Sequence, residues 1–514
     1  MKLDQLKVGA ILSYVALGLG IIITFVFTPF MIRTLGPSEY GLFILVLAII
    51  SYLTVLDFGF GNAIVRYTAK YKAEQNIAQE EKMLGMFWIL YIALGVLSFA
   101  LVIIMNINFK SFFADSMTDS EIEIARVLMW LAGFNMAMSF PFSIFTSIIT
   151  AYERFIFLKV VNLIRQIANP LMMVIALLIG YKAIGMIVVV TALNILFNLI
   201  SWIYCKRKIK VRIRFSGIDV PLFKEISKYS FFVFIALIVD RVYWGTGQLL
   251  IAKFINPASV AVFGIGMQFV NVFYMPMSTA ISGVFLPKLT AISLEDEHEK
   301  KLSDIFIKVG RIQLIVLSLI MSGFVIFGQS FIKLWVGDLY ADSYFICLIL
   351  MIPLTIPLAQ SIGISILQAR NLHAFRSIIY LIIAVANIIV SIIFIQLFGV
   401  IGGAVGTAVS LIAGQIVIMN IYYKRKINID IFGFWKEVFK LMPAILVTCG
   451  IGLVFQYFVP SGSWLFLIIN VVFFTLVYLV VMYFIGINQY EKDLFVTPVK
   501  QLLGKLLKRG VAHD

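Results

Sequence analysis

Apolar runs long enough to cross a lipid bilayer recur along the whole chain. A hydrocarbon core of about 30 Å requires roughly 20 apolar residues in a helix, and fourteen stretches of about this length occur among the 514 residues. Only helices and closed barrels satisfy every backbone hydrogen bond in lipid, so runs of this length indicate a bundle of membrane-spanning helices. The predicted spans are residues 8–32, 41–65, 83–106, 124–149, 156–180, 185–204, 229–254, 258–286, 305–329, 342–367, 374–397, 401–422, 439–459 and 465–487.

Composition excludes a soluble globular protein. Hydrophobic residues make up 62% of the chain and charged residues only 13%, whereas soluble domains carry about 25% charged residues. The mean hydropathy is +1.03. The first span is too long for a cleaved signal sequence, so we expect it to remain as a membrane anchor. The sequence therefore predicts an all-α polytopic membrane protein with about 14 transmembrane helices.

The distribution of basic residues predicts the orientation of the chain. With a cytoplasmic N-terminus, five of the 41 lysines and arginines fall in outer loops and four within spans, and the others lie in inner loops and tails. This is the pattern of the positive-inside rule. An even number of spans returns the C-terminus to the cytoplasm. Topology and attraction to anionic membrane lipids thus explain the formal net charge of +15, and we expect no nucleic-acid partner.

No motif of an enzyme or a metal site is recognisable in the sequence. Cys205, Cys347 and Cys449 lie in or beside spans without the spacing of a metal or redox site. The three histidines are isolated from one another, and no nucleophile motif or phosphate loop occurs in a soluble segment. We therefore expect no catalytic residue, no metal ligand and no bound cofactor.

Short matches at one nearly constant offset indicate an internal duplication. Two copies of a membrane-embedded unit are typical of transporters. The matching segments are 168–169 with 386–387, 184–185 with 401–402, 206–208 with 424–426, and Pro37 with Pro257, at separations of 217 to 220 residues.

The duplication and the loops divide the chain into five segments. We predict an N-lobe of six spans (1–204), a cytoplasmic linker (205–228), a C-lobe of six spans (229–423), two additional spans (424–487) and a cytoplasmic tail (488–514). The tail combines leucines and lysines at helical spacing, which is typical of an amphipathic helix on the membrane surface.

Charged residues within the predicted spans are the candidate site residues. A charge near the bilayer centre costs on the order of 3 kcal/mol or more, so it normally faces water or a partner. Arg241 lies midway between Lys228 and Lys253, too deep to extend its side chain to the interface. Arg126 and Arg311 lie closer to span ends, where their side chains could reach it. The full set is Arg126, Arg165, Arg241, Arg311, Asp57 and Asp240.

Trp244 and Gln248 extend the possible site around Arg241. They follow it by three and seven residues and therefore share its helix face. Trp244 is either a surface for stacking of a sugar or of Arg241 itself, or a buried core aromatic. Asp240 points about 100° away on the same helix and either couples an ion or neutralises a neighbouring arginine.

Asp57 has two alternative roles. In the first it is functional, either as a proton or cation site or as a gate partner for a cation of the other lobe. In the second it is a structural carboxylate. In the second case its partners would be backbone groups that Gly59 and Gly61 free by loosening the helix.

Three segments resemble one transporter family. They are residues 35–43 (LGPSEYGLF), residues 56–67 (LDFGFGNAIVRY) and residues 240–254 in the seventh span. They look like the polysaccharide-type flippases of the multidrug/oligosaccharidyl-lipid/polysaccharide exporter (MOP) superfamily. The resemblance extends over essentially the whole chain, including the number of spans and the duplication.

The resemblance implies a fold and a function. The fold would be a V-shaped pair of six-helix lobes with two appended helices, in which spans 1, 2, 7 and 8 line a central cavity. The substrate would be an undecaprenyl-pyrophosphate-linked oligosaccharide, carried from the inner to the outer leaflet of the bacterial cytoplasmic (inner) membrane by alternating access. An ion gradient, of H⁺ or Na⁺, would drive the transport. Expected partners are this substrate, membrane lipids and a glycan polymerase or glycosyltransferases.

The family's anionic substrate gives the candidate residues their expected roles. Arg241, Arg165, Trp244, Gln248, Arg126 and Arg311 are candidates for substrate binding, and Asp57 and Asp240 for ion coupling or a gate.

Other functions stay open. The multidrug branch of the superfamily would export organic cations and favour acidic residues, whereas four deep arginines against two aspartates favour an anionic substrate. A peptidoglycan-precursor lipid is an alternative anionic cargo. A glycan polymerase or ligase usually carries a large outer loop, and the longest outer loop here, about 107–123, is short.

Overall fold

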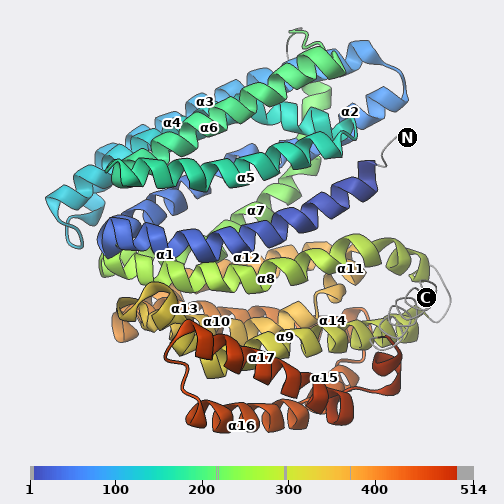
Figure 1. The fold of residues 1–514 in the computed structure, drawn as a ribbon. Helices are drawn as coiled ribbons and strands as arrows, with labels where there is room; N and C mark the ends of the chain where they lie inside the picture. Colours follow the sequence, from blue (N-terminus) through green and yellow to red (C-terminus); the bar gives the residue numbers. More distant parts are fainter. Residues whose placement is uncertain (1–4, 216, 218, 294–297, 371, 495–514) are drawn as a thin grey trace, which may run out of the picture. The chain divides into compact units, whose positions relative to one another are not determined.

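A computed structural model describes residues 5–215, 217, 219–293, 298–370 and 372–494. Within these ranges the secondary structure is helical, without strands (Figure 1). The α-helices are α1 (Gln5–Leu53), α2 (Phe60–Ala73), α3 (Ile77–Phe113), α4 (Asp119–Ala151), α5 (Phe155–Leu178), α6 (Lys182–Tyr204), α7 (Val220–Phe254), α8 (Pro257–Ile292), α9 (His298–Val336), α10 (Asp342–Ala359), α11 (Ile362–Ala369), α12 (His373–Phe398), α13 (Val400–Leu411), α14 (Met419–Lys426), α15 (Ile431–Phe439), α16 (Met442–Phe458) and α17 (Trp464–Val481).

The described helices that could cross a membrane correspond to the predicted spans. Thirteen of them are long and apolar enough to span a bilayer. The first, Ile11–Ala73, has 63 residues and contains both of the first two predicted spans. Its two parts are separated at Gly36, whose φ of 76° lies outside the helical region. The prediction of an all-α polytopic membrane protein with about 14 transmembrane helices is confirmed.

Polar caps fix where several spans begin. Thr118 and Glu121 form a reciprocal capping box at the start of α4. The Asp219 side chain accepts a hydrogen bond from the Leu222 amide at the start of α7, and Pro221 follows within the first turn, where a missing N–H costs nothing. Such caps satisfy backbone amides that the helix leaves without partners.

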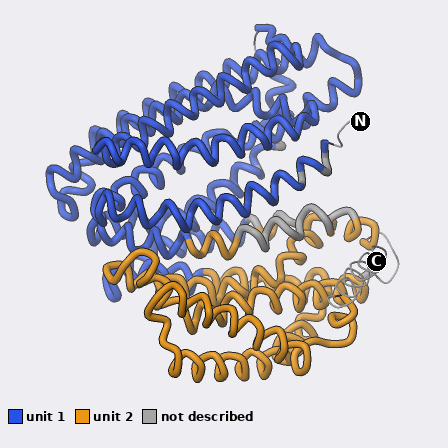
Figure 2. Tube along the Cα trace, viewed as in Figure 1, with its two compact units in different colours: residues 1–268, 377–410 blue, residues 269–376, 411–514 orange. Residues whose placement is uncertain are grey.

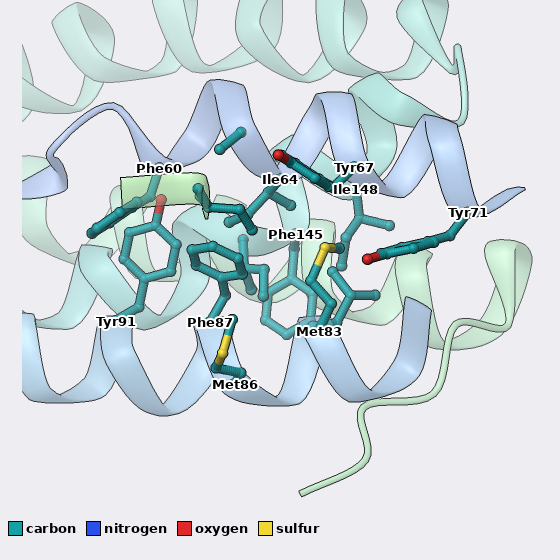
Figure 3. Packing of buried hydrophobic residues seen from close by; sticks show 14 of the residues in the cluster. Phe60, Ile64, Tyr67, Tyr71, Met83, Met86, Phe87, Tyr91, Phe145 and Ile148 are labelled. Carbon is teal, nitrogen blue, oxygen red and sulfur yellow. The ribbon is translucent and has the colours of Figure 1, made fainter. Parts of the chain in front are cut away.

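One compact unit comprises residues 1–268 and 377–410 (Figure 2). Helix α4 contacts α1, α2, α3 and α6 and is the central helix of this unit. Phe60 and Tyr67 of α2 and Phe87 of α3 are buried in its main core, as Figure 3 shows. Leu222 and Ile226 of α7 belong to the same core, so the first half of α7 is anchored among the helices that precede it.

The second compact unit comprises residues 269–376 and 411–514 (Figure 2). Helix α9 contacts α10, α15, α16 and α17. Ile326 and Phe327 of α9 form a buried cluster with Leu467 and Phe474 of α17. The two helices beyond the predicted repeat are thus packed on α9.

The predicted lobes, 1–204 and 229–423, stay a prediction, because compact units report packing and not duplication. Two helix pairs nevertheless carry the offset of the sequence matches. Helices α5 and α12 begin at Phe155 and His373, and α6 and α13 at Lys182 and Val400, each pair 218 residues apart. Most of the predicted tail helix lies outside the described residues.

Candidate functional site

Helix α7 carries the candidate arginine at membrane depth. Arg241 lies eight residues after the start and thirteen before the end of the apolar stretch Val233–Phe254. At about 1.5 Å per residue, both ends are more than about 10 Å away along the helix. The Arg241 side chain is half-buried, and among the described residues it forms neither a hydrogen bond nor a salt bridge. The adjacent Asp240 carboxylate attracts this charge electrostatically, but no described carboxylate contacts the guanidinium directly.

The neighbours of Arg241 hold α7 against α1 and α13. The Tyr52 hydroxyl of α1 lies 2.9 Å from the Thr246 hydroxyl. The Tyr243 hydroxyl donates to the Thr407 carbonyl of α13 at 3.2 Å, and the Tyr243 side chain is only 6% exposed. The backbone of α7 is thus fixed on both sides of Arg241, which restricts where the guanidinium can reach.

The other α7 candidates differ in exposure. Trp244 and Gln248 are half-buried like Arg241, as expected of residues on one helix face. The Trp244 ring meets the Tyr243 ring edge-on at 5.2 Å between centroids. Asp240 is exposed on the surface of the described residues, and its carboxylate attracts the neighbouring Arg241 electrostatically. Roles for all four residues in substrate binding or coupling stay predictions.

Asp57 lies where the helix breaks between α1 and α2. It ends the 3₁₀ turn η1 (Thr54–Asp57), and Phe58 and Gly59 follow in the left-handed region, with φ of 51° and 75°. At Gly59 a Cβ atom would meet the Val233 side chain of α7, so a residue with a side chain would be strained and also collide. The break is therefore specified by glycine and packed on α7.

The Asp57 carboxylate is hydrogen-bonded within this break. The Tyr91 hydroxyl of α3 donates to its Oδ1 atom at 2.6 Å, and the backbone amides of Gly59 and Gly61 donate to the same carboxylate. This arrangement matches the structural alternative for Asp57. A role in ion coupling stays a prediction, to which the structure adds Tyr91 as the direct partner.

We expect Tyr91→Phe to lower stability by about 1–3 kcal/mol, because the half-buried Asp57 carboxylate loses a hydrogen-bond donor while the ring remains. The thermal unfolding midpoint of the detergent-solubilised protein measures this loss. Tyr14→Phe removes the same hydroxyl from a side chain that is 69% exposed and serves as the control. Equal midpoints for the two variants would contradict the role assigned to Tyr91.

Arg126 is bound on the surface of the α3–α4 pair. Its Nε atom donates to Asn106 Oδ1 at 3.0 Å, and Asn106 Nδ2 donates back to the Arg126 carbonyl at 2.8 Å. The Arg126 side chain is exposed, whereas Asn106 is fully buried. These contacts give Arg126 a structural role in joining two helices, and its predicted part in substrate binding stays untested.

Arg311 is enclosed by carboxylates of the second unit. Its Nε donates to Glu491 Oε1 at 2.7 Å and its Nη1 to Glu437 Oε2 at 2.8 Å. Nη2 donates to the Gly486 carbonyl at 3.1 Å and to Glu491 Oε2 at 3.0 Å. Arg311 is 3% and Glu491 1% exposed. The guanidinium is thus committed to a buried ion cluster that joins α9 to α15 and to the segment after α17.

Arg165 lies near the middle of α5, with ten residues before it and thirteen after it. Its guanidinium carbon lies 5.2 Å from the centre of the Phe197 ring of α6, and its Nε atom has no hydrogen-bond partner. Arg165 and Arg241 are thus the candidate arginines whose side chains form no hydrogen bond or salt bridge with a described residue, whereas Arg126 binds an asparagine and Arg311 two carboxylates.

Sequence analysis missed two groups of polar contacts. Asn194 Nδ2 of α6 donates to Asn135 Oδ1 and Ser139 Oγ of α4, at 2.6 and 2.7 Å. A polar residue deep in an apolar span is the signal that points to Asn194, and the four-residue spacing of Asn135 and Ser139 places them on one face of α4.

The second missed group ties both ends of α7 to other helices of its unit. The Tyr67 hydroxyl of α2 donates to Glu225 Oε1 at 2.8 Å. At the far end, Lys253 Nζ lies 3.3 Å from Asp115 Oδ2, between α3 and α4. No local pattern predicts these pairs, because their partners are more than a hundred residues apart.

A family model described as "Polysaccharide biosynthesis protein" matches residues 6–293. The chain belongs to this family. The match extends over α1 to α8 and therefore includes Asp57, Arg165 and Arg241. No curated protein matches the chain.

Solved structures with the same fold are membrane transporters. The lipid II flippase MurJ, in an inward closed conformation, is 18% identical with a TM-score of 0.71, and the alignment covers 93% of this family member and 98% of MurJ. A multidrug resistance MATE transporter, facing inward, is 15% identical with a TM-score of 0.62, covering 80% and 98% of the two chains. A MOP-superfamily transporter from Pyrococcus furiosus is 15% identical with a TM-score of 0.56, covering 81% and 96%.

The family and the fold agree with the resemblance read from the sequence. This polysaccharide biosynthesis protein is a multi-pass membrane protein with the fold of MOP-superfamily transporters. The fold is shared by flippases and drug exporters, so the substrate depends on the side chains that each protein carries.

Proposed function

We propose that the protein is a flippase that moves an undecaprenyl-pyrophosphate-linked oligosaccharide from the inner to the outer leaflet. The carrying observation is Arg241, a guanidinium at membrane depth that forms no hydrogen bond or salt bridge with a described residue. Such a charge is costly in lipid and is typically retained where an anion must be bound. Membership of a polysaccharide biosynthesis family supports a lipid-linked sugar as that anion.

Arg241 suits the pyrophosphate of this substrate. The planar guanidinium can donate two parallel hydrogen bonds to phosphate oxygens, and it remains charged at any physiological pH. Gln248 and Trp244 on the same face would contact the first sugar, the glutamine by hydrogen bonds and the indole by stacking. We assign the protein no catalytic reaction, because flipping changes the position of the substrate and none of its bonds.

Transport in one direction needs an energy source. We infer coupling to an ion gradient, of H⁺ or Na⁺, with Asp57 and Asp240 as the carboxylates that could bind the ion. We place the protein in the cytoplasmic (inner) membrane of a bacterium with both termini in the cytoplasm, which the distribution of basic residues supports. Glycosyltransferases that build the substrate and a polymerase that consumes it are the proposed partners.

A peptidoglycan precursor is the second candidate substrate. The likeness to the lipid II flippase MurJ extends over 93% of this chain, and both substrates would present a pyrophosphate to Arg241. A polysaccharide repeat unit is preferred because the family model is one of polysaccharide biosynthesis.

Cells that lack the protein are expected to accumulate the lipid-linked oligosaccharide on the cytoplasmic side while its synthesis continues. The block would lie after assembly and before export, so surface polysaccharide should fall to background. The measurement is quantification of extracted lipid-linked sugars, with membrane sidedness read by a glycosidase that cannot cross the membrane. Restoring the gene provides the control.

Two other results would change the assignment. Normal surface polysaccharide together with raised sensitivity to cationic dyes would favour a multidrug exporter. Accumulation of a peptidoglycan precursor, with cell lysis, would favour the second candidate substrate.

A further inference from the structure

Arg165 is a charged residue at mid-membrane depth that the proposed site on α7 does not explain. From Phe155 to Arg165 the helix rises about 15 Å, and from Arg165 to Leu178 about 20 Å, at about 1.5 Å per residue. Its side chain is half-buried, and no described charged group lies close enough to influence it. The Phe197 ring offers a cation–π contact, worth about 1–2 kcal/mol, but it accepts no strong hydrogen bond. The N–H groups of the guanidinium therefore need another acceptor.

Asn169 lies one turn further along the same face of α5. It follows Arg165 by four residues, and such residues are neighbours on a helix surface. The Oδ1 atom of Asn169 is buried and has no hydrogen-bond partner. The Asn169 Oδ1 acceptor and the Arg165 Nε donor, both without a hydrogen-bond partner, thus lie one helical turn apart.

Helix α6 adds polar groups opposite these two residues. Arg165 contacts Phe197, and the position of Gly185 faces Ala176, so α5 and α6 run antiparallel. In this register Asn169 faces the turn of α6 that carries Asn194. Asn194 in turn binds Asn135 and Ser139 of α4. Three helices therefore contribute polar side chains to one region of the first unit.

The internal repeat provides a comparison within the same chain. At the offset of 218 residues, the counterpart of Asn169 is Asn387 and the counterpart of Arg165 is Ile383. Asn387 is 2% exposed, and its Oδ1 accepts a hydrogen bond from the Ser391 hydroxyl at 2.9 Å. Ile383 is 7% exposed.

The comparison between the two copies shows whether packing of this helix requires an arginine. An apolar residue fills the arginine position in the second copy, and the Oδ1 atom of the asparagine there is satisfied by its own helix, while its Nδ2 atom donates to the Tyr243 carbonyl of α7. Packing of this helix type therefore does not require an arginine at position 165. Since a deep charge without a structural need is costly, its presence in the first copy points to a ligand.

We propose that Arg165 and Asn169 form a binding site for an oxyanion that carries a neighbouring hydroxyl group. The guanidinium donates to the oxyanion, and Asn169 Oδ1 accepts from the hydroxyl. Asn194 and its partners hold the opposite wall in place.

Two parts of a lipid-linked oligosaccharide have this chemistry, so as a substrate site this proposal rests on the proposed function. A glycosyl phosphate has its phosphate at C1 and a hydroxyl at C2, and a uronic acid has its carboxylate beside the C4 hydroxyl. Either would be a second anchor on the substrate in addition to Arg241, and the second source would mean that the transported glycan is itself acidic.

The test uses the purified full-length protein in lipid nanodiscs and isothermal titration calorimetry. The probes are glucose 1-phosphate, glucuronic acid, glucose as the neutral control and sulfate as an oxyanion without a hydroxyl. We expect the protein to bind glucose 1-phosphate or glucuronic acid more tightly than glucose, and the tighter of the two identifies the source. Arg165→Ile, which installs the residue of the second copy, should weaken that binding about 10- to 100-fold, as expected for loss of a hydrogen bond to a charged group.

Asn169→Ala separates the two halves of the site. It should weaken binding of glucose 1-phosphate or glucuronic acid but leave sulfate binding unchanged, because sulfate carries no hydroxyl to donate to Asn169. Thermal unfolding midpoints at or above the wild-type value are expected for Arg165→Ile. Should that variant fail to insert, Arg165→Gln replaces it with the same expected loss.

Equal affinity for glucose and for the charged probes, or unchanged affinity in Arg165→Ile, would overturn the site. The export assay in cells lacking the protein is independent of these titrations. Arg165-dependent binding with normal export would refute the flippase and leave the oxyanion site, whereas blocked export with Arg165-independent binding would do the reverse.

Discussion

Arg241→Ala is expected to abolish glycan export while the protein still inserts into the membrane. Arg241 has no described hydrogen-bond or salt-bridge partner, so its removal leaves no buried carboxylate behind, and insertion should not suffer. Loss of a buried, hydrogen-bonded charge from a binding site costs about 2–5 kcal/mol, which is a tens- to thousands-fold loss of substrate affinity. Complementation of cells lacking the protein, with surface glycan normalised to membrane protein level, measures the effect.

Two further variants give this experiment its specificity. Arg241→Lys keeps the charge but not the bidentate geometry, so partial export is expected. Arg33→Ala removes an exposed arginine from α1 and should export normally. Full glycan export in cells that carry the Arg241→Ala variant would show that Arg241 has a structural role only. It would also remove the main support for an anionic substrate.

Arg311→Met is expected to destabilise the second unit by about 3–5 kcal/mol, because it leaves the Glu437 and Glu491 carboxylates in place without their cation. Glu491 is 1% exposed and cannot be solvated without movement of the chain. Since Arg311 also binds the Gly486 carbonyl, the segment after α17 should detach from α9. Limited proteolysis and the amount of full-length protein in membranes report this change.

Lys333→Met is the matched control for Arg311→Met. Lys333 lies on the same helix and pairs with Asp338 at 3.0 Å, but the two side chains are 66% and 75% exposed. An exposed pair of this kind contributes about 0–1 kcal/mol. The triple change Arg311→Met, Glu437→Gln and Glu491→Gln should recover part of the lost stability, because no unpaired buried charge remains. Equal stability of the Arg311 and Lys333 variants would show that the cluster does not hold α9 to the C-terminal segment.

The arginines within spans illustrate how far sequence reasoning extends. Apolar flanks identified Arg126, Arg165, Arg241 and Arg311 as costly charges, since depth in a span follows from position along the chain. Their contacts differ in the structure. Arg126 binds a neighbouring asparagine, and Arg311 binds two carboxylates. The side chains of Arg165 and Arg241 form no hydrogen bond or salt bridge with a described residue. Sequence could not separate these cases, because Glu437 and Glu491 lie 126 and 180 residues from Arg311.

The break at Asp57 shows the opposite situation. Gly59 and Gly61 predict a loosened helix. Residue spacing alone can also suggest a carboxylate that accepts hydrogen bonds from the freed backbone amides. The structure adds Tyr91, which comes from another helix and is buried by packing of α2, α3 and α4. The backbone contacts of Asp57 could thus be predicted from the sequence, whereas its partner Tyr91 from a distant segment could not.

The sequence by itself determined that this chain crosses a membrane many times as helices and resembles a MOP-superfamily flippase. Hydrophobic length and the need to satisfy every backbone group in lipid allow few other outcomes. Only the tertiary structure decided which charged side chains have partners. Which side chains become partners depends on how neighbouring helices are rotated and shifted against one another. This arrangement results from the packing of many apolar side chains, and the order of those side chains in the sequence does not specify their neighbours.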